Sequence, residues 1–406
     1  MSFDLTKIRA DFPILEEKIH GQRLVYLDSG ASAQKPQAVL DRITRAYTHE
    51  YANVHRGLHT LSNRATDAFE KARETVRTFL NANSGDEIVF TRSATEAINL
   101  VAEAFAGPRI GEGDEIVLSI MEHHSNIVPW HFHRERKGAV LRWVDVNDDG
   151  SFDLDAFEQA LSARTKIVAI THMSNVLGTI TPLEQIIGIA HARGVPVLVD
   201  GSQGAVHTKV DVQELGADFY IMTGHKLYGP TGVGVLYGRL DLLAEMRPYQ
   251  GGGEMIEDVT LEDVTYSDPP HRFEAGTPPI VQAIGLGAAL DYINAVGRDE
   301  IEAHEKDVGA YAAAELQKIN GLRMIGSAKG KGAIFSFEIE GVHAHDLSAI
   351  MDRYGVAIRA GTHCAQPLLK RFGATSTCRA SFALYNGRDD VEALVDAIKR
   401  ASAFFA

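Results

Sequence analysis

The fold is decided by two stretches, Val195-Pro-Val-Leu-Val-Asp200 and Asp218-Phe-Tyr-Ile-Met-Thr-Gly-His-Lys226. Each contains an apolar run, which is typical of a strand that is covered on both faces. Lys226 comes 26 residues after Asp200, which is enough chain for one crossover helix. We therefore expect two parallel strands, Val195–Asp200 and Asp218–Gly224, that place the Asp200 carboxylate and the Lys226 amine close together.

The first half of the chain repeats this alternation of short strands and longer helices. Helical spacing of apolar residues is clearest in Ala65–Leu80 and Leu183–Ala192. The alternation predicts an α/β fold with a mostly parallel sheet of the seven-stranded type. A short Gly- and Pro-rich turn precedes Val233–Tyr237, so we expect that strand to run antiparallel. The other strands that we expect are Val25–Asp28, Glu87–Thr91, Glu115–Ile120, Val140–Val146 and Lys166–His172.

The second half of the chain has a different pattern. Residues Gly251–Pro279 combine glycines, acids and prolines, which predicts a long irregular segment with a functional role. A long helix over Ile280–Ala295 follows, and then helices around fewer strands indicate a smaller α+β domain. We expect a large domain over 21–290 and a small domain from 1–20 and 291–406. The strands expected in the small domain are Leu322–Ile325, Ala333–Ile339, Val356–Arg359 and Arg379–Tyr385.

Composition narrows the class of protein. The 406 residues include 40 basic and 54 acidic side chains, a net charge of −14, so nucleic acid is not expected as a partner. No apolar stretch is long enough to span a bilayer, and the acids from Asp4 to Glu17 do not fit a secretory signal. The 2 cysteines are too few for a disulfide framework, which favours a reducing compartment. We expect a cytoplasmic enzyme without a membrane partner.

The pair Asp200 and Lys226 suggests a cofactor. Taken alone, Asp200 is most simply a helix cap and Lys226 a lysine that reaches solvent. Together they suit a cofactor with an aldehyde and a cationic ring nitrogen, and pyridoxal 5'-phosphate has both groups. Its phosphate requires an anion site, and Ser93-Ala-Thr95-Glu96 opens a predicted helix, Thr95–Ala106, with a capping-box pattern. That pattern is weak evidence alone, because capping boxes are common.

The histidines of Met121-Glu122-His123-His124 follow another strand end. His123 is placed to lie against a cofactor ring or to relay protons. Zinc is not expected, because no HExxH motif occurs and no cysteine cluster accompanies the histidines. We interpret His124, His131 and His133 as ordinary polar or helix-surface residues. The glycines of Gly229–Gly234 do not form an ATP-binding loop.

A reactive cysteine is expected in Arg359-Ala-Gly-Thr-His-Cys364-Ala-Gln-Pro367. Cys364 lies on a Gly-flanked loop beside a histidine and near arginines, which favours a thiolate. Cys378, inside a predicted strand, fits an inert buried thiol. The planar guanidinium of Arg379 suits a substrate carboxylate, although most arginines only solvate a surface.

Taken in order, the motifs of the whole chain resemble those of cysteine desulfurases, which are pyridoxal-phosphate enzymes of the class-V aminotransferase group. The loop around Cys364 marks the desulfurases most specifically, and the most similar branch is the SUF-type (group II), selenocysteine lyase-like branch. The resemblance implies fold type I. The motifs are Val25-Tyr-Leu-Asp-Ser29, Ser93-Ala-Thr-Glu-Ala-Ile-Asn99, Glu122-His-His-Ser-Asn126, Ser174-Asn-Val-Leu-Gly178, Asp200-Gly-Ser-Gln203, Thr223-Gly-His-Lys226 and Arg359–Pro367.

The resemblance implies a role for each site residue. Lys226 bonds covalently to the cofactor aldehyde, Asp200 pairs with the pyridinium nitrogen, and His123 stacks on the ring. The sequence departs from the family at two positions. Thr362 stands where many relatives have histidine, and Gly30 stands where alanine is common. Both bear on substrate fit or acceptor preference. Asn175 and Gln203 are implied to lie near the ring hydroxyl, and His55 and Arg359 near the substrate. The substrate carboxylate is implied to bind Arg379 with Asn175. The residues implied to hold the phosphate are Thr95, Thr223, His225 and, from a second subunit, Thr277.

The implied reaction converts L-cysteine to L-alanine and leaves a persulfide on Cys364, with His123 and Lys226 as the other catalytic residues. Its sulfur goes to a small SUF-type acceptor protein for iron–sulfur cluster assembly, and the enzyme is a homodimer. The alternatives are a selenocysteine lyase, a kynureninase- or aminotransferase-like enzyme of the same class, and a protein of this fold that serves as a binding partner. Retention of both Lys226 and Asp200 argues against the last.

Overall fold

The computed structural model describes residues 3–405. Within this range a seven-stranded sheet has the order β4-β10-β9-β8-β7-β5-β6. Strands β5 to β9 run parallel to one another, and β10 pairs antiparallel with both β9 and β4. The expected α/β fold and the antiparallel strand are confirmed. The strands are β4 (Ile88–Thr91), β5 (Glu115–Ser119), β6 (Val140–Val144), β7 (Thr165–Thr171), β8 (Val197–Asp200), β9 (Phe219–Thr223) and β10 (Gly234–Gly238).

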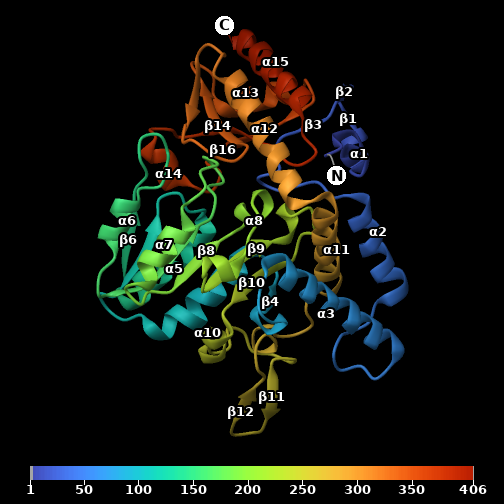
Figure 1. Ribbon diagram of the computed structural model, residues 1–406, viewed down its shortest axis with the longest axis vertical. Coiled ribbons are helices and arrows are strands. Elements are labelled where there is room, and N and C mark those ends of the chain that lie inside the picture. Colours follow the sequence, from blue (N-terminus) through green and yellow to red (C-terminus); the bar gives the residue numbers. More distant parts are fainter. Residues whose placement is uncertain (1–2, 406) are drawn as a thin grey trace.

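Helices pack on both faces of this sheet and form two apolar cores with it. Helix α11 (Ile280–Val296) is apolar on nearly every side, because it packs against both α2 (Gln37–Arg45) and α3 (Thr60–Leu80) (Figure 1). Helix α4 (Ala94–Leu100) continues as a wider π-helical turn over Val101–Ala106. The other helices of this part are α5 (Val128–Lys137), α6 (Leu154–Ala160), α7 (Leu183–His191), α8 (Gly204–His207), α9 (Val212–Leu215) and α10 (Leu240–Glu245).

The C-terminal part has its own antiparallel sheet and its own apolar core. In the described chain this sheet has the order β13-β14-β17-β16, as expected for a smaller α+β unit. The expected strand Arg379–Tyr385 lies earlier, at Thr377–Ser381. The elements are α12 (Arg298–Leu316), β13 (Leu322–Ile325), β14 (Ile334–Ile339), α13 (Ala344–Asp352), β16 (Arg359–Gly361), α14 (Gln366–Arg371), β17 (Thr377–Ser381) and α15 (Arg388–Phe405).

Three sequence expectations need correction. The Val25–Asp28 strand is not part of the main sheet: β3 (Val25–Tyr26) pairs in parallel with β15 (Val356–Ala357). The Val356–Arg359 strand is therefore split between β15 and β16, which belong to different sheets. Residues 251–279 are not wholly irregular, because β11 (Ile256–Val259) and β12 (Val264–Tyr266) form a hairpin that projects away from the C-terminal sheet (Figure 1).

The N-terminal segment contacts the C-terminal part of the chain. Helix α1 (Leu5–Ala10) carries Arg9, whose guanidinium lies 2.7 Å from both Asp389 and Asp390 at the start of α15. A short hairpin, β1 (Lys18–Ile19) with β2 (Gln22–Arg23), leads into β3. The domain boundaries near residues 20 and 290 stay a prediction.

A search of residues 3–405 for membrane spans finds no single helix that is long and apolar enough. Helices α11 and α12 meet the combined criterion of length and apolar composition only when taken together, and the chain bends by 76° between them.

Candidate active site

The predicted site residues gather in a cavity of ≈ 180 Å³ at the carboxyl ends of β7, β8 and β9. This is where ligands bind in open parallel sheets. The start of α4 lines one side, and β17 with the turn before α14 lines the other. The predicted residues that line the cavity are Thr95, His123, Asn175, Asp200, Gln203, Thr223, His225, Lys226, Arg359, Cys364 and Arg379.

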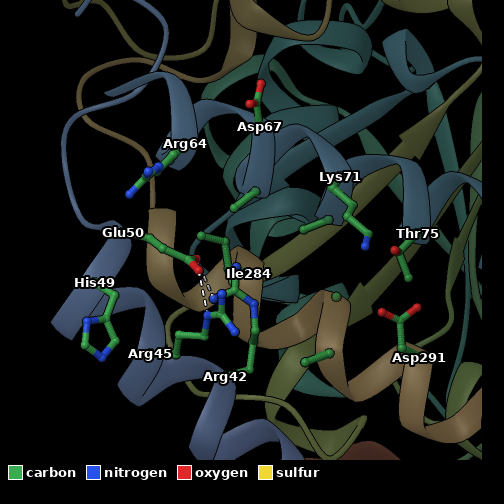
Figure 2. A pocket seen from close by; sticks show the side chains of 14 residues that line it. Arg42, Arg45, His49, Glu50, Arg64, Asp67, Lys71, Thr75, Ile284 and Asp291 are labelled. Carbon is green, nitrogen blue, oxygen red and sulfur yellow. Dashed lines mark hydrogen bonds and ion pairs between the residues drawn. The ribbon is translucent and has the colours of Figure 1, made fainter. Parts of the chain in front are cut away.

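A larger cleft of ≈ 660 Å³ lies between α2, α3 and α11 (Figure 2). Its labelled side chains carry charges of both signs, and Glu50 pairs with Arg42 and Arg45 inside it. None of the predicted site residues lines this cleft. The smaller cavity is therefore the candidate active site, because it holds the reactive groups.

Lys226 and Asp200 occupy the ends of adjacent strands, as expected. Strand β8 pairs in parallel with β9, so Asp200 at the end of β8 lies beside the turn that carries Lys226. Burial lowers the pKa of Lys226 to about 8, although the Asp200 carboxylate acts in the opposite direction. The Ser202 N–H donates to Asp200 Oδ1 over 3.0 Å and fixes the carboxylate. The site thus presents an amine with a reduced pKa beside a buried acid.

The phosphate side is formed by the start of α4 and the end of β9. Ser93 Oγ accepts the Glu96 N–H at 3.2 Å, whereas the Glu96 carboxylate accepts the Arg92 N–H at 2.6 Å, so the predicted capping box is only half formed. Thr95 Oγ1 lies 2.8 Å from Ser125 Oγ. Thr223 Oγ1 is buried and has no hydrogen-bond partner among residues 3–405. An unsatisfied hydroxyl at this point is what an anion would complete.

Residues 121–126 follow β5, and we call them the histidine loop. Glu122 anchors this loop to the sheet. Glu122 is fully buried and accepts hydrogen bonds from Ser119 Oγ (2.5 Å), the Thr171 N–H (3.0 Å) and Asn126 Nδ2 (2.8 Å). Burial raises the pKa of this carboxyl to about 8. The loop is thereby tied to the ends of β5 and β7.

His123 and Ser125 are the residues of the histidine loop that line the cavity. His123 Nδ1 accepts the Ser125 N–H over 3.1 Å, which leaves the ring proton on Nε2. Burial and the Lys226 cation lower the pKa of His123 to about 4. The ring is therefore neutral at pH 7 and suited to lie against a flat ligand.

The side of the cavity toward the C-terminal sheet carries two arginines and one acid. Arg379 Nη2 donates to Asp28 Oδ1 over 3.0 Å, and Arg359 Nε donates to Asp28 Oδ2 over 3.3 Å. Arg379 Nη1 donates to the Asn175 carbonyl, whereas its Nε is buried without a partner in the described chain. Burial lowers the pKa of Arg379. Such a guanidinium suits a small carboxylate ligand.

The two cysteines have opposite environments. Cys364 is exposed and lines the cavity, in a left-handed conformation with φ 55°. Cys378 is buried in β17 and donates to the Ala344 carbonyl, and burial raises its pKa to about 12. Only the thiolate is a nucleophile, so the exposed Cys364 stays the candidate for the reactive thiol, and the buried Cys378 fits an unreactive one.

Two predicted site residues lie outside this cavity within one copy of the chain. His55 Nε2 lies 2.9 Å from Glu70, and its ring packs edge-on against Phe69. Thr277 follows Glu274, which is buried against Arg73 in α3. No group of three or more potential metal-ligand side chains occurs within residues 3–405.

Sequence reasoning assigned no role to Glu122 or Asp28. Asp28 ends an apolar run with a carboxylate, and that is the signal that singled out Asp200. Glu122 lies beside two histidines, and a single acid between a buried strand and a helix gives no distinctive sequence signal. Gln203 and Asn175 were expected at the ring, and each is also tied to a neighbouring loop, Gln203 to the Gly30 carbonyl and Asn175 to the His363 carbonyl.

The residues fit pyridoxal 5'-phosphate. A buried amine and a buried acid lie at adjacent strand ends, as an aldehyde and a ring nitrogen require. A side chain at Gly234 would place its Cβ 2.4 Å from the Ser93 carbonyl carbon, so this glycine allows the start of α4 to approach the sheet closely. The unpartnered Thr223 hydroxyl faces the same region, since Thr223 and Ser93 both line the cavity.

Comparisons with known proteins agree with this site. The sequence profile of the family Aminotransferase class-V matches residues 25–394. The chain is 51% identical to a cysteine desulfurase of Dickeya dadantii over 399 residues, covering 98% of this chain and 97% of that protein. It is 49% identical to a probable cysteine desulfurase of Halalkalibacterium halodurans, with 98% of each chain covered. The crystal structure of the cysteine desulfurase CsdA (S-sulfonic acid) from Escherichia coli superimposes with a TM-score of 0.93 at 41% identity, covering 100% of both chains.

The profile spans most of the chain, and full-length relatives share about half of its residues. The protein therefore belongs to the class-V aminotransferase family. The relatives just described that match it over nearly their whole length are named cysteine desulfurases.

Proposed function

We propose that this protein is a pyridoxal 5'-phosphate-dependent cysteine desulfurase that converts L-cysteine to L-alanine and retains the sulfur as a persulfide on Cys364. One observation carries the proposal: the exposed thiol of Cys364 and the buried amine of Lys226 line the same small cavity. A cofactor lysine alone would serve many reactions, but a nucleophilic sulfur beside it serves sulfur transfer. Full-length relatives named cysteine desulfurases support the same reaction.

The cofactor, when bound, withdraws electrons from the substrate's α-carbon. Lys226 would bond covalently to the cofactor through Nζ, and the same amine, when free, would take the α-proton of the substrate. Asp200 provides the negative charge that holds a proton on the ring nitrogen. Thr95, Thr223 and His225 would hold the cofactor phosphate, and the neutral ring of His123 would lie against the cofactor ring. Arg379 binds the substrate carboxylate.

Cys364 accepts the sulfur. The bond from the substrate's Cβ to sulfur breaks, the electron pair stays with carbon, and Cβ takes a proton to give alanine. A new S–S bond forms at Cys364 Sγ, so carbon is reduced and sulfur is oxidised to the persulfide level. Arg359 and Arg379 line the same cavity as Cys364.

The persulfide passes to a small acceptor protein of the SUF type in the cytoplasm, where its sulfur enters iron–sulfur clusters. The functional unit is a homodimer in which Thr277 of one copy reaches the phosphate of the other. The position of Thr277 outside the cavity of its own copy supports this arrangement. Size-exclusion chromatography with light scattering tests the dimer, and a monomer of full activity would exclude it.

The reaction is tested with matched cysteine variants. C364A should keep the change in cofactor absorbance when L-cysteine is added but should lose alanine formation and the sulfur adduct on the protein. C378A is the control and should match the wild type, because the Cys378 thiol is buried away from the cavity. Alanine formed by C364A at the wild-type rate would favour a kynureninase- or aminotransferase-like reaction. Borohydride trapping followed by mass spectrometry should locate the cofactor on Lys226.

Selenocysteine has nearly the shape of cysteine, and one cavity accommodates both. The same assay with L-selenocysteine, measuring alanine and selenide, compares the two substrates. A desulfurase should form alanine from cysteine at a rate that depends on Cys364. A protein that processes selenocysteine alone is a selenocysteine lyase, and that result would replace the proposal.

A further inference from the structure

His124, unlike its neighbours His123 and Ser125, does not line the cavity. It contacts instead the turn that carries Cys364. The His124 N–H donates to the Cys364 carbonyl over 2.8 Å. The Gln366 N–H donates to His124 Nε2 over 3.3 Å. His124 is thus bonded twice to the segment that directly follows the Cys364 Cα, at the Cys364 carbonyl and at the Gln366 N–H.

The hydrogen bond from the Gln366 N–H to the His124 ring satisfies a donor that the helix α14 leaves without a partner. Gln366 is the first residue of α14, and the N-cap position is Ala365, which has no polar side chain. The first N–H groups of a helix need acceptors that the helix itself cannot supply. His124 supplies one such acceptor from a distant part of the chain, whereas it usually comes from the side chain of the N-cap residue.

The turn that His124 holds is strained. His363 and Cys364 are successive residues with φ of 52° and 55°, a region that side chains other than glycine and asparagine seldom occupy. Such a conformation persists only where surrounding contacts fix it. Asn175 Nδ2 bonds to the His363 carbonyl on one side (2.8 Å), and His124 bonds on the other.

We propose that His124 is a positioning residue that holds the Cys364 turn so that Sγ faces the substrate's sulfur. The proposal rests on the function given above, and it assigns to neighbouring histidines two separate tasks. His123 contacts the cofactor site, whereas His124 fixes the place of the nucleophile. Burial lowers the pKa of His124, so that its ring stays a neutral acceptor.

The first experiment measures the turn itself in the resting holoenzyme. Hydrogen–deuterium exchange of a peptide covering residues 361–368 should be about tenfold faster in H124A, because the Gln366 N–H loses its acceptor. H124Q should restore slow exchange, since the glutamine oxygen can take the place of Nε2. H131A is the control, because His131 lies on α5 outside this contact. Unchanged exchange in H124A would overturn the proposal.

The second experiment separates the two half-reactions. In a single turnover with L-cysteine, H124A should form the Cys364 persulfide about tenfold more slowly, with KM within about twofold of wild type. The absorbance change on adding cysteine should keep its wild-type amplitude, and H124Q should recover most of the persulfide rate. A wild-type rate in H124A, or equal loss in H124Q and H124A, would refute the positioning role.

These outcomes are distinct from a failure of the proposed function. If the wild-type enzyme forms no persulfide, the function is wrong, and the exchange measurement still reports on the turn. If the wild type forms persulfide and H124A forms it at the same rate, the proposed function is supported and the positioning role of His124 is wrong.

Discussion

Two arginine–glutamate pairs in this protein have the same separation but different burial. Arg73 and Glu274 lie 2.7 Å apart, and each side chain is 4% exposed. Arg109 and Glu245 also lie 2.7 Å apart, but their side chains are 33% and 65% exposed. The comparison predicts that removing the buried acid destabilises the protein far more than removing the exposed one.

The magnitude follows from the contacts of Glu274. Its Oε1 accepts a hydrogen bond from Arg73 Nη1, and its Oε2 accepts one from Arg73 Nη2. Oε1 also accepts a hydrogen bond from the Phe90 N–H over 2.6 Å. Burial alone would lower the pKa of Arg73, but Glu274 and, after it, Glu70 outweigh burial and raise it, so E274A leaves a buried cation whose remaining acidic partner is the more exposed Glu70. Such a loss costs about 3–5 kcal/mol, whereas an exposed pair contributes about 0–1 kcal/mol.

Thermal unfolding of the holoenzyme, followed by circular dichroism, measures the difference. At about 2.1 cal/mol/K per residue, 406 residues give an unfolding entropy of about 0.85 kcal/mol/K. E274A should therefore lower Tm by about 4–6 °C, and E245A by about 1 °C or less. Equal shifts in the two variants would refute the reasoning that burial, and not distance, sets the value of these pairs.

Three further changes test the site and its support. G234A should weaken cofactor binding about tenfold, because its Cβ would lie 2.4 Å from Ser93, whereas G188A, with open space around it, should not; absorbance titration of the apo-protein measures both, and equal affinities would contradict the role of the glycine. E122A should lower the free energy of unfolding by about 3 kcal/mol, because three buried donors lose their acceptor, and E122Q by less than half of that. Urea denaturation at pH 7 compares the two, and an equal loss would exclude this account. Burial lowers the pKa of His172 to about 4, so the unfolded chain binds the extra proton between pH 6.5 and 4 and stability falls as pH decreases through this window. Between pH 7 and pH 5 the wild type should lose about 2 kcal/mol more than H172Q, and the same loss in both would show that His172 is not responsible.

The sequence was sufficient to place the reactive pair. Asp200 and Lys226 each follow an apolar run, and parallel strands bring their carboxyl ends to one edge of the sheet, so position along the chain determines position in space. The same reasoning placed His123 after β5. Cys364 was found from its neighbours, because a thiol flanked by glycine, histidine and arginine is unusual for a buried structural cysteine.

Contacts between distant short segments were not predictable. Strand β3 has only two residues, and nothing in its apolar pattern distinguishes pairing with β15 from pairing in the main sheet. The role of Asp28 depends on that pairing, because it brings the carboxylate to Arg359 and Arg379. The left-handed turn at His363 and Cys364 also had no sequence signal, since neither residue favours that conformation.

The contact of Asp28 with Arg379 joins groups 351 residues apart in the chain. During synthesis the ribosome releases residue 28 long before residue 379, so the wall that we propose for the substrate carboxylate cannot exist on a partial chain. The main sheet can assemble earlier, because its last strand ends at Gly238. A nascent chain can therefore acquire its cofactor-binding sheet first and becomes able to capture substrate only when translation is nearly complete.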